Sequence, residues 1–193
     1  METDLDTIID AKLKPRNVWD EYCPIIVSED GKRLQAYLTD GIDIPASYNE
    51  LHYKLSQLTE DCAVDLYINN GGGIIDSALY LGDAMSNCKA VVNGHLSGTV
   101  ASAATILTMR CDNITVAPFT QFLIHNYSGG VQGKGKEAKD QMEFVNNEIN
   151  ESFRDFYHGF LTPDEIEDVI GDHDIWLNSR QIMERWETKK AQK

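Results

Sequence analysis

The same order of elements occurs twice in the middle of the chain: a short apolar strand, a turn of glycine or other small residues, and an amphipathic helix. The first unit has a strand at 63–68, three glycines at 71–73 and a helical pattern over 75–85. The second has a strand at 90–93, a small-residue stretch over 94–101 and a helical pattern over 103–109. Repeats of this kind require right-handed crossovers between parallel strands. The sequence therefore predicts an α/β fold with a mainly parallel sheet.

The flanking patterns extend this fold with helices on both sides. Apolar residues at spacings of three and four predict a helix over 46–58, and two short strands follow the second unit at 114–117 and 121–125. The longest helix is predicted near 130–160, from a stripe of seven apolar residues: Ala138, Met142, Val145, Ile149, Phe153, Phe156 and Phe160. A surface helix of a small domain needs a shorter stripe, so we expect an exposed end of this helix to pack against a neighbouring subunit. The alternative is that the whole stripe is buried in the core of the domain.

Composition narrows the classes of partner. The 193 residues carry 31 acidic against 17 basic side chains, a formal net charge of −14, which argues against nucleic acid or an anionic membrane as partner. No apolar run has the ~20 residues needed to span a bilayer, and no secretory signal is visible, so we expect a cytoplasmic protein with reduced thiols. Three segments are predicted: a flexible N-terminal segment over 1–19, a single domain over 20–186 and a charged C-terminal tail over 187–193.

Three candidate chemical groups fall at the carboxyl ends of predicted parallel strands, where α/β sheets bind ligands. Ser102 stands where a turn enters a helix, His125 closes an apolar strand, and the Gly71–Gly73 turn offers backbone N–H donors. A phosphate loop is the weaker interpretation, because the lysine of such loops is absent. Each residue alone is compatible with simple packing, but a serine, a histidine and a donor loop together favour acyl transfer.

Four segments in this order resemble the proteolytic subunit of Clp protease, a serine peptidase of the Clp/crotonase superfamily. Residues 66–73 (LYINNGGG) resemble its LYINSPGG segment, and residues 98–102 (GTVAS) resemble its G-x-A-A-S. Residues 123–126 (LIHN) resemble its MIHQ, and residues 129–133 (GGVQG) resemble its G-G-x-x-G. The resemblance covers about three quarters of the chain, from Arg33 to Ser179.

The resemblance implies a fold and a set of site residues. It implies repeated β-β-α units, a mainly parallel sheet and a long protruding handle helix at about 130–160. Ser102 would be the nucleophile and His125 the general base, with no metal or other cofactor. The oxyanion would be held by backbone N–H groups of Gly72, Gly73 and Ala103, and the peptide would lie along Gly129, Gly130, Val131 and Gln132.

The third member of the triad has alternatives. Asp168, Asp172 and Asp174 all precede the aromatic-apolar segment Ile175-Trp176-Leu177. The spacing of the shorter, phage-type relatives selects Asp172, whereas the spacing of the bacterial enzymes selects Asp168. We favour Asp172, whose carboxylate would hold the His125 tautomer and stabilise the imidazolium.

The function implied is ATP-independent hydrolysis of peptides or unfolded proteins inside the chamber of a heptameric ring, single or stacked in pairs. An AAA+ unfoldase is the expected partner that feeds the chamber. The final strand of the family is replaced here by Glu184-Arg185-Trp186-Glu187, so a relative that works without an unfoldase stays an alternative. The alternatives are a catalytically inactive ring subunit, a scaffold-processing relative that needs no unfoldase, and a crotonase-type acyl-CoA enzyme.

Overall fold

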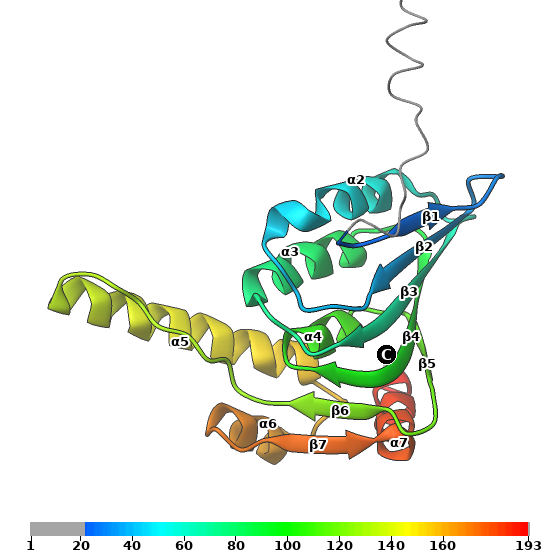
Figure 1. The fold of residues 1–193 in the computed structure, drawn as a ribbon. Coiled ribbons are helices and arrows are strands. Elements are labelled where there is room, and N and C mark those ends of the chain that lie inside the picture. Colours follow the sequence, from blue (N-terminus) through cyan, green and yellow to red (C-terminus); the bar gives the residue numbers. More distant parts are fainter. Residues whose placement is uncertain (1–21, 193) are drawn as a thin grey trace, which may run out of the picture.

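A single mixed sheet of seven strands organises residues 22–192, the part of the chain that the computed structural model describes (Figure 1). The strand order is β1-β2-β3-β4-β6-β7, with β5 also paired to β4. The pairs around β3 and β4 are parallel, whereas β1 and β7 are antiparallel to their neighbours at the two edges. The strands are β1 Ile25–Val27, β2 Arg33–Leu38, β3 Ala63–Asn70, β4 Val91–Ala101, β5 Asn113–Val116, β6 Gln121–Ile124 and β7 Ile175–Asn178. The predicted α/β class is confirmed.

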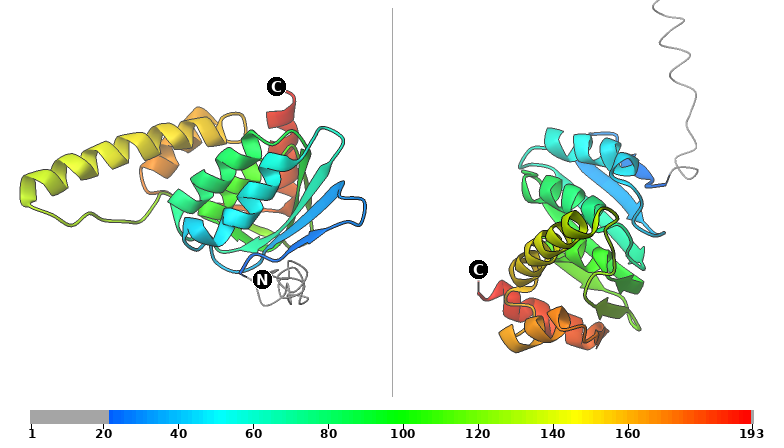
Figure 2. Two further views of the ribbon diagram at one scale, coloured as in Figure 1. Left: turned by 90° about the horizontal axis from the view of Figure 1, so that it is seen from above. Right: turned by 90° about the vertical axis from the view of Figure 1, so that its left-hand side faces the viewer.

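Helices α2, α3 and α4 pack side by side against one face of this sheet (Figures 1 and 2). Their apolar sides cover inward-facing strand residues such as Leu34, Leu66 and Val92, each at most 1% exposed. The helices of the described chain are η2 Pro45–Tyr48 (a 3-10 turn), α2 Asn49–Gln57, α3 Ile75–Ser86, α4 Ala103–Met109, α5 Gly135–Tyr157, α6 Pro163–Ile170 and α7 Ser179–Lys190. Across residues 22–192, no helix combines the length and the apolar character needed to cross a bilayer.

Strand β4 is longer than the sequence suggested, and this decides where Ser102 lies. The predicted strand ended at Gly94, but β4 continues to Ala101. Gly94 lies inside β4, and glycine is needed there because the space for a side chain is occupied. A Cβ at this position would lie 2.9 Å from Cys111 Sγ. The small residues after Gly94 therefore form the second half of a strand rather than a turn, and Ser102 follows directly at its carboxyl end.

Helix α5 projects from the body of the molecule (Figures 1 and 2). Its 23 residues bury apolar side chains only toward the carboxyl end, where Ile149, Phe153 and Phe156 enter the core. Toward the amino end the stripe residues Ala138, Met142 and Val145 are half-buried, and Phe144, which lies outside the stripe, is 65% exposed. The helix stops at Tyr157, before the last residue of the predicted stripe, and Phe160 is buried from the following turn.

The described residues include only one of the two predicted terminal segments. The predicted N-terminal segment 1–19 lies outside the described residues. The boundary drawn at residue 186 falls inside α7, so residues 187–190 are helix and not a tail. Lys189 Nζ donates to the carbonyls of Phe156 and His158, and Lys190 Nζ donates to the carbonyl of Asp112. These lysines fix the last turn of α7 to the body of the domain.

All four cysteines lie within the described residues, and none of them forms a disulfide. Cys23 and Cys111 are buried, and Cys62 and Cys88 are half-buried. Burial raises the pKa of Cys111 to about 12, so this thiol stays protonated at neutral pH. Its role is to pack against Gly94, and it offers no nucleophile.

Candidate active site

Ser102 is held in a strained backbone conformation between β4 and α4. Its φ of 55° and ψ of −130° are rare for a residue with a side chain. The Ser102 N–H donates to the Leu123 carbonyl at 2.9 Å, and its own carbonyl accepts from the Thr105 N–H and hydroxyl at 2.9 and 2.6 Å. Backbone strain that is fixed by neighbours on both sides is characteristic of functional positions.

The Gly72–Gly73 turn presses directly against Ser102. A Cβ on Gly72 would lie 2.5 Å from Ser102 Cβ and 2.6 Å from the Ala101 carbonyl, and the Gly72 φ is +91°. Gly73 has a φ of +151°, and a Cβ there would lie 2.2 Å from the Ile42 carbonyl. Only glycine satisfies both the dihedral angles and the space at these two positions. This close approach therefore requires glycine at positions 72 and 73.

The turn offers fewer backbone donors than the sequence suggested. The Gly72 N–H donates to Asn70 Oδ1 at 2.8 Å, so this member of the predicted oxyanion site already has a partner. The bridge between Ile42 and Gly73 uses the N–H groups of Ile42 and Ile74, which leaves the Gly73 N–H outside it. Ala103 is the first residue of α4, where an N–H has no acceptor within the helix. Gly73 and Ala103 are therefore the donors that remain for a bound group.

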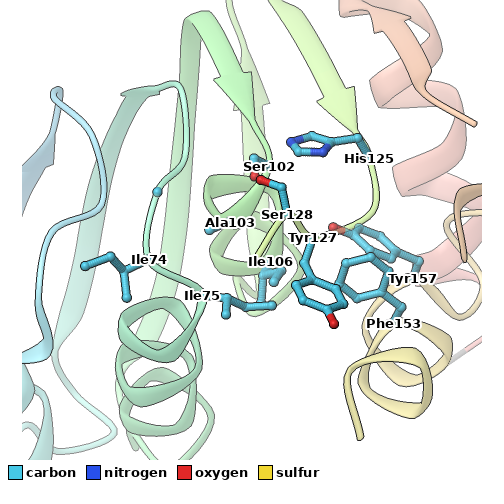
Figure 3. Close-up of a pocket in the computed structure, with 11 residues that line it drawn as sticks. Ile74, Ile75, Ser102, Ala103, Ile106, His125, Tyr127, Ser128, Phe153 and Tyr157 are labelled. Atoms are coloured by element: carbon cyan, nitrogen blue, oxygen red, sulfur yellow. The ribbon is translucent and has the colours of Figure 1, made fainter. Parts of the chain in front are cut away.

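Ser102 and His125 line one pocket of about 370 Å³ (Figure 3). Strand β4 pairs with β6 through Ala101 and Leu123, so the residues just beyond both strands reach the same cavity. Within residues 22–192, the Ser102 hydroxyl and the His125 ring make no hydrogen bond to each other. Such bonds are often long before substrate binds. The rest of the wall is mainly apolar and includes Ile75, Ile106, Tyr127, Phe153 and Tyr157.

The three candidate acids occupy different places relative to His125. Strands β6 and β7 pair antiparallel, with Ile124 opposite Ile175, and extending this register by one residue places Asp174 opposite His125. Asp172 is exposed and its Oδ1 accepts a hydrogen bond from Asn126 Nδ2 at 2.8 Å. Asp168 is exposed on α6. The favoured residue, Asp172, is thus bound to the residue after His125, whereas Asp174 lies opposite His125 in the extended register.

The predicted peptide-binding segment runs alongside α5 without regular structure of its own (Figure 1). Gly129, Gly130 and Gln132 are exposed, and Val131 is half-buried. Across the described chain, the backbone N–H and C=O groups of residues 128–133 make no hydrogen bonds. Unpaired backbone groups beside a pocket can pair with an extended peptide.

Comparison with known proteins found similarity over most of the chain. The model of the Clp protease family matches residues 42–185. The chain belongs to the Clp protease family. One curated relative, the ATP-dependent Clp protease proteolytic subunit 2 of Pseudomonas aeruginosa, is 27% identical over 161 residues, which cover 79% of this chain and 78% of the relative.

The resemblance of the quoted motifs is thus confirmed for the family as a whole. The matched region contains both Ser102 and His125, together with all three candidate acids. Membership in this family supports a peptidase function. Asp174 was visible in the sequence, but only the pairing of β6 with β7 distinguishes it from its neighbours.

Proposed function

We propose that this chain is a serine peptidase subunit in which Ser102 is the nucleophile and His125 the general base. The observation that carries the proposal is the convergence of a strained Ser102, two backbone donors and His125 on one pocket. A serine beside a base and an N–H pair is the arrangement needed for acyl transfer. Family membership supports peptide bonds as the target.

In the proposed reaction, His125 takes the proton of the Ser102 hydroxyl while the Ser102 oxygen attacks the scissile carbonyl. The N–H groups of Gly73 and Ala103 hold the developing oxyanion, and His125 returns the proton to the leaving amine. Water then attacks the acyl-enzyme with His125 again acting as base. Gly72 contributes through its lack of a side chain, which lets the donor turn approach Ser102.

Asp174 is the acid that we propose to orient His125. It lies opposite His125 in the extended β6–β7 register, and a carboxylate there would stabilise the imidazolium formed during attack. Asp172 is assigned a different role, because Asn126 already holds its carboxylate. The turn between α6 and β7 thereby stays fixed beside His125.

The pocket and the segment next to it indicate how a peptide would bind. The backbone groups of residues 128–133, which include Gly129, Gly130, Val131 and Gln132, would pair with an extended substrate. The substrate side chain directly before the scissile bond would enter the apolar pocket. We therefore expect cleavage after apolar residues, in unfolded proteins or peptides.

We propose that the subunit works inside a homo-oligomeric ring of seven, single or stacked in pairs, in the cytoplasm. The exposed Phe144 on the projecting α5 supports contact with a second subunit, as expected of a handle helix. An AAA+ unfoldase would feed the chamber. Residues 22–192 form the peptidase domain and include the last helix, α7.

Peptide hydrolysis by a small panel of variants tests the proposal. Ser102→Ala and His125→Ala should each lower kcat by at least about 1,000-fold, and Asp174→Asn should lower it by about the same order. Asp172→Asn is the matched control and should keep most of the activity. Equal losses in Asp172→Asn and none in Asp174→Asn would return the orienting role to Asp172.

The same panel separates the alternatives. Activity retained in both Ser102→Ala and His125→Ala would contradict the serine mechanism and favour a crotonase-type enzyme that uses backbone donors alone. An assembled wild-type protein that neither cleaves peptides nor reacts with a fluorophosphonate would be an inactive ring subunit. Degradation of a folded substrate without an unfoldase would indicate a scaffold-processing relative.

A further inference from the structure

Tyr127 contacts both the catalytic pocket and the projecting helix. Its ring lines the pocket that holds Ser102 and His125. Its hydroxyl donates to Asn146 Oδ1 on α5 and lies 3.6 Å from Met142 Sδ. Figure 3 shows the ring next to Phe153 and Tyr157, with its hydroxyl directed away from Ser102. The side chain thus spans the distance between pocket and helix.

The segment after Tyr127 has few other attachments. Residues 128–133 make no backbone hydrogen bonds within the described chain, and the next bond joins the Ala138 N–H to the Lys134 carbonyl. Gly129 lies over the Tyr127 ring, since a Cβ on it would be 3.4 Å from Cε2 and 3.5 Å from Cδ2. The position of the Tyr127 ring therefore determines where this segment begins.

We propose that the Tyr127–Asn146 hydrogen bond is a clasp that sets substrate specificity. The clasp holds the Tyr127 ring as a wall of the pocket for the substrate's apolar side chain, and it holds residues 128–133 where they pair with the peptide backbone. Tyr127 and Asn146 act as positioning residues. This inference rests on the proposed peptidase function.

The clasp should affect substrate binding more than the chemical step. Ser102 is fixed by the Leu123 carbonyl and by Thr105, and His125 follows β6, so neither depends on Asn146. A single hydrogen bond between partly buried neutral groups changes an equilibrium by about 2- to 12-fold. Loss of the clasp is therefore expected to raise KM by about 3- to 10-fold and to leave kcat within about twofold.

A double-mutant cycle in the full-length protein tests this coupling. Tyr127→Phe keeps the ring and removes the hydroxyl, and Asn146→Ala removes the acceptor. Each should raise KM for a peptide with leucine before the scissile bond by about 3- to 10-fold, and the double variant should rise no further than the larger single effect. The preference for leucine over alanine at this position should fall by a similar factor.

Two controls separate this inference from the proposed function. Asn147→Ala changes an exposed neighbour on α5 and should leave KM unchanged. The rate of fluorophosphonate labelling at Ser102 should be the same in all variants, because the reagent does not need residues 128–133. Two results in an active wild-type protein background would overturn the clasp alone: KM unchanged in the variants, or KM raised in the double variant by the product of the two single effects. A wild-type protein without labelling or cleavage would overturn both.

Discussion

Gly72 shows at the scale of one residue how the sequence builds the site. Its Cα lies against Ser102, and its φ is positive, which residues with a side chain rarely adopt. The neighbouring Gly71 differs, because a Cβ on it would meet nothing within 4 Å. Two adjacent glycines thus have different requirements, and this difference can be measured.

Gly72→Ala should cost roughly 2–4 kcal/mol of stability and lower kcat/KM by at least about 100-fold, because the new Cβ displaces Ser102 or the donor turn. Gly71→Ala should stay within about 1 kcal/mol of the wild type in stability and keep its activity. Urea unfolding and peptide hydrolysis measure the two effects. Equal behaviour of the two variants would contradict the close approach of Gly72 to Ser102.

The sequence identifies some candidate site residues more directly than others. Ser102 and His125 could be named because each terminates a strand and sits in a recognisable motif. The choice of Asp172 over Asp168 rested on spacing, whereas the cross-strand partner of His125 depends on the β6–β7 register, which spacing does not contain. Likewise, the Gly72 N–H could not be known to pair with Asn70 before the turn was seen.

At the scale of elements, the carboxyl-terminal helices are joined by one ion pair. Arg185 on α7 makes two hydrogen bonds to Glu165 on α6, at 2.8 and 2.7 Å, and both side chains are about 28% exposed or less. The Arg185 guanidinium, together with the Thr162 N–H, lowers the pKa of Glu165 to about 2. The same carboxylate closes the capping box of α6, so it serves two elements at once.

Acid should weaken this connection in a defined direction. The pKa of Glu165 is lower in the folded chain than its ordinary value of 4.5, so its contribution is complete above about pH 5 and is lost as pH falls toward 2. Glu165→Gln should lower stability at pH 7 by about 1–2 kcal/mol and flatten the acid dependence in this window. Thermal unfolding from pH 2.5 to 7 measures both.

Asp164→Asn is the matched control, because Asp164 is the exposed acid directly before Glu165 in the first turn of α6. It should lower stability at pH 7 by less than Glu165→Gln and keep most of the wild-type pH dependence. An unchanged acid slope in Glu165→Gln would contradict the assignment.

Among the elements, the helices were predicted from the sequence more accurately than the length of β4. The patterns of α3 and α4 were clear from apolar spacing. The length of β4 was missed because Gly94 reads as a turn residue, although here it fits a narrow space beside Cys111. Tertiary packing decided this position, and local propensity could not reveal it.

At the scale of the whole molecule, α5 projects from the domain and carries an exposed aromatic side chain. Phe144 and Tyr53 are both 65% exposed, but Phe144 stands on the projecting half of α5 and Tyr53 stands on α2. If α5 joins copies of the chain, a charge at Phe144 should disrupt that contact, whereas a charge at Tyr53 should not.

Phe144→Glu is therefore expected to lower the mass of the assembly in sedimentation velocity and to leave the circular dichroism spectrum unchanged. Tyr53→Glu should keep the wild-type mass. A wild-type protein that sediments as a 21.7 kDa monomer at all concentrations would contradict the role given to α5.

The most direct test of the central claim is to map the site of covalent labelling. Wild-type protein is treated with a fluorophosphonate, digested and analysed by mass spectrometry, with His125→Ala and Ser102→Ala in parallel. The account predicts one adduct, on the peptide that contains Ser102, which is strongly reduced in His125→Ala and absent in Ser102→Ala. Peptide hydrolysis with no adduct, or with the adduct on another residue, would contradict it.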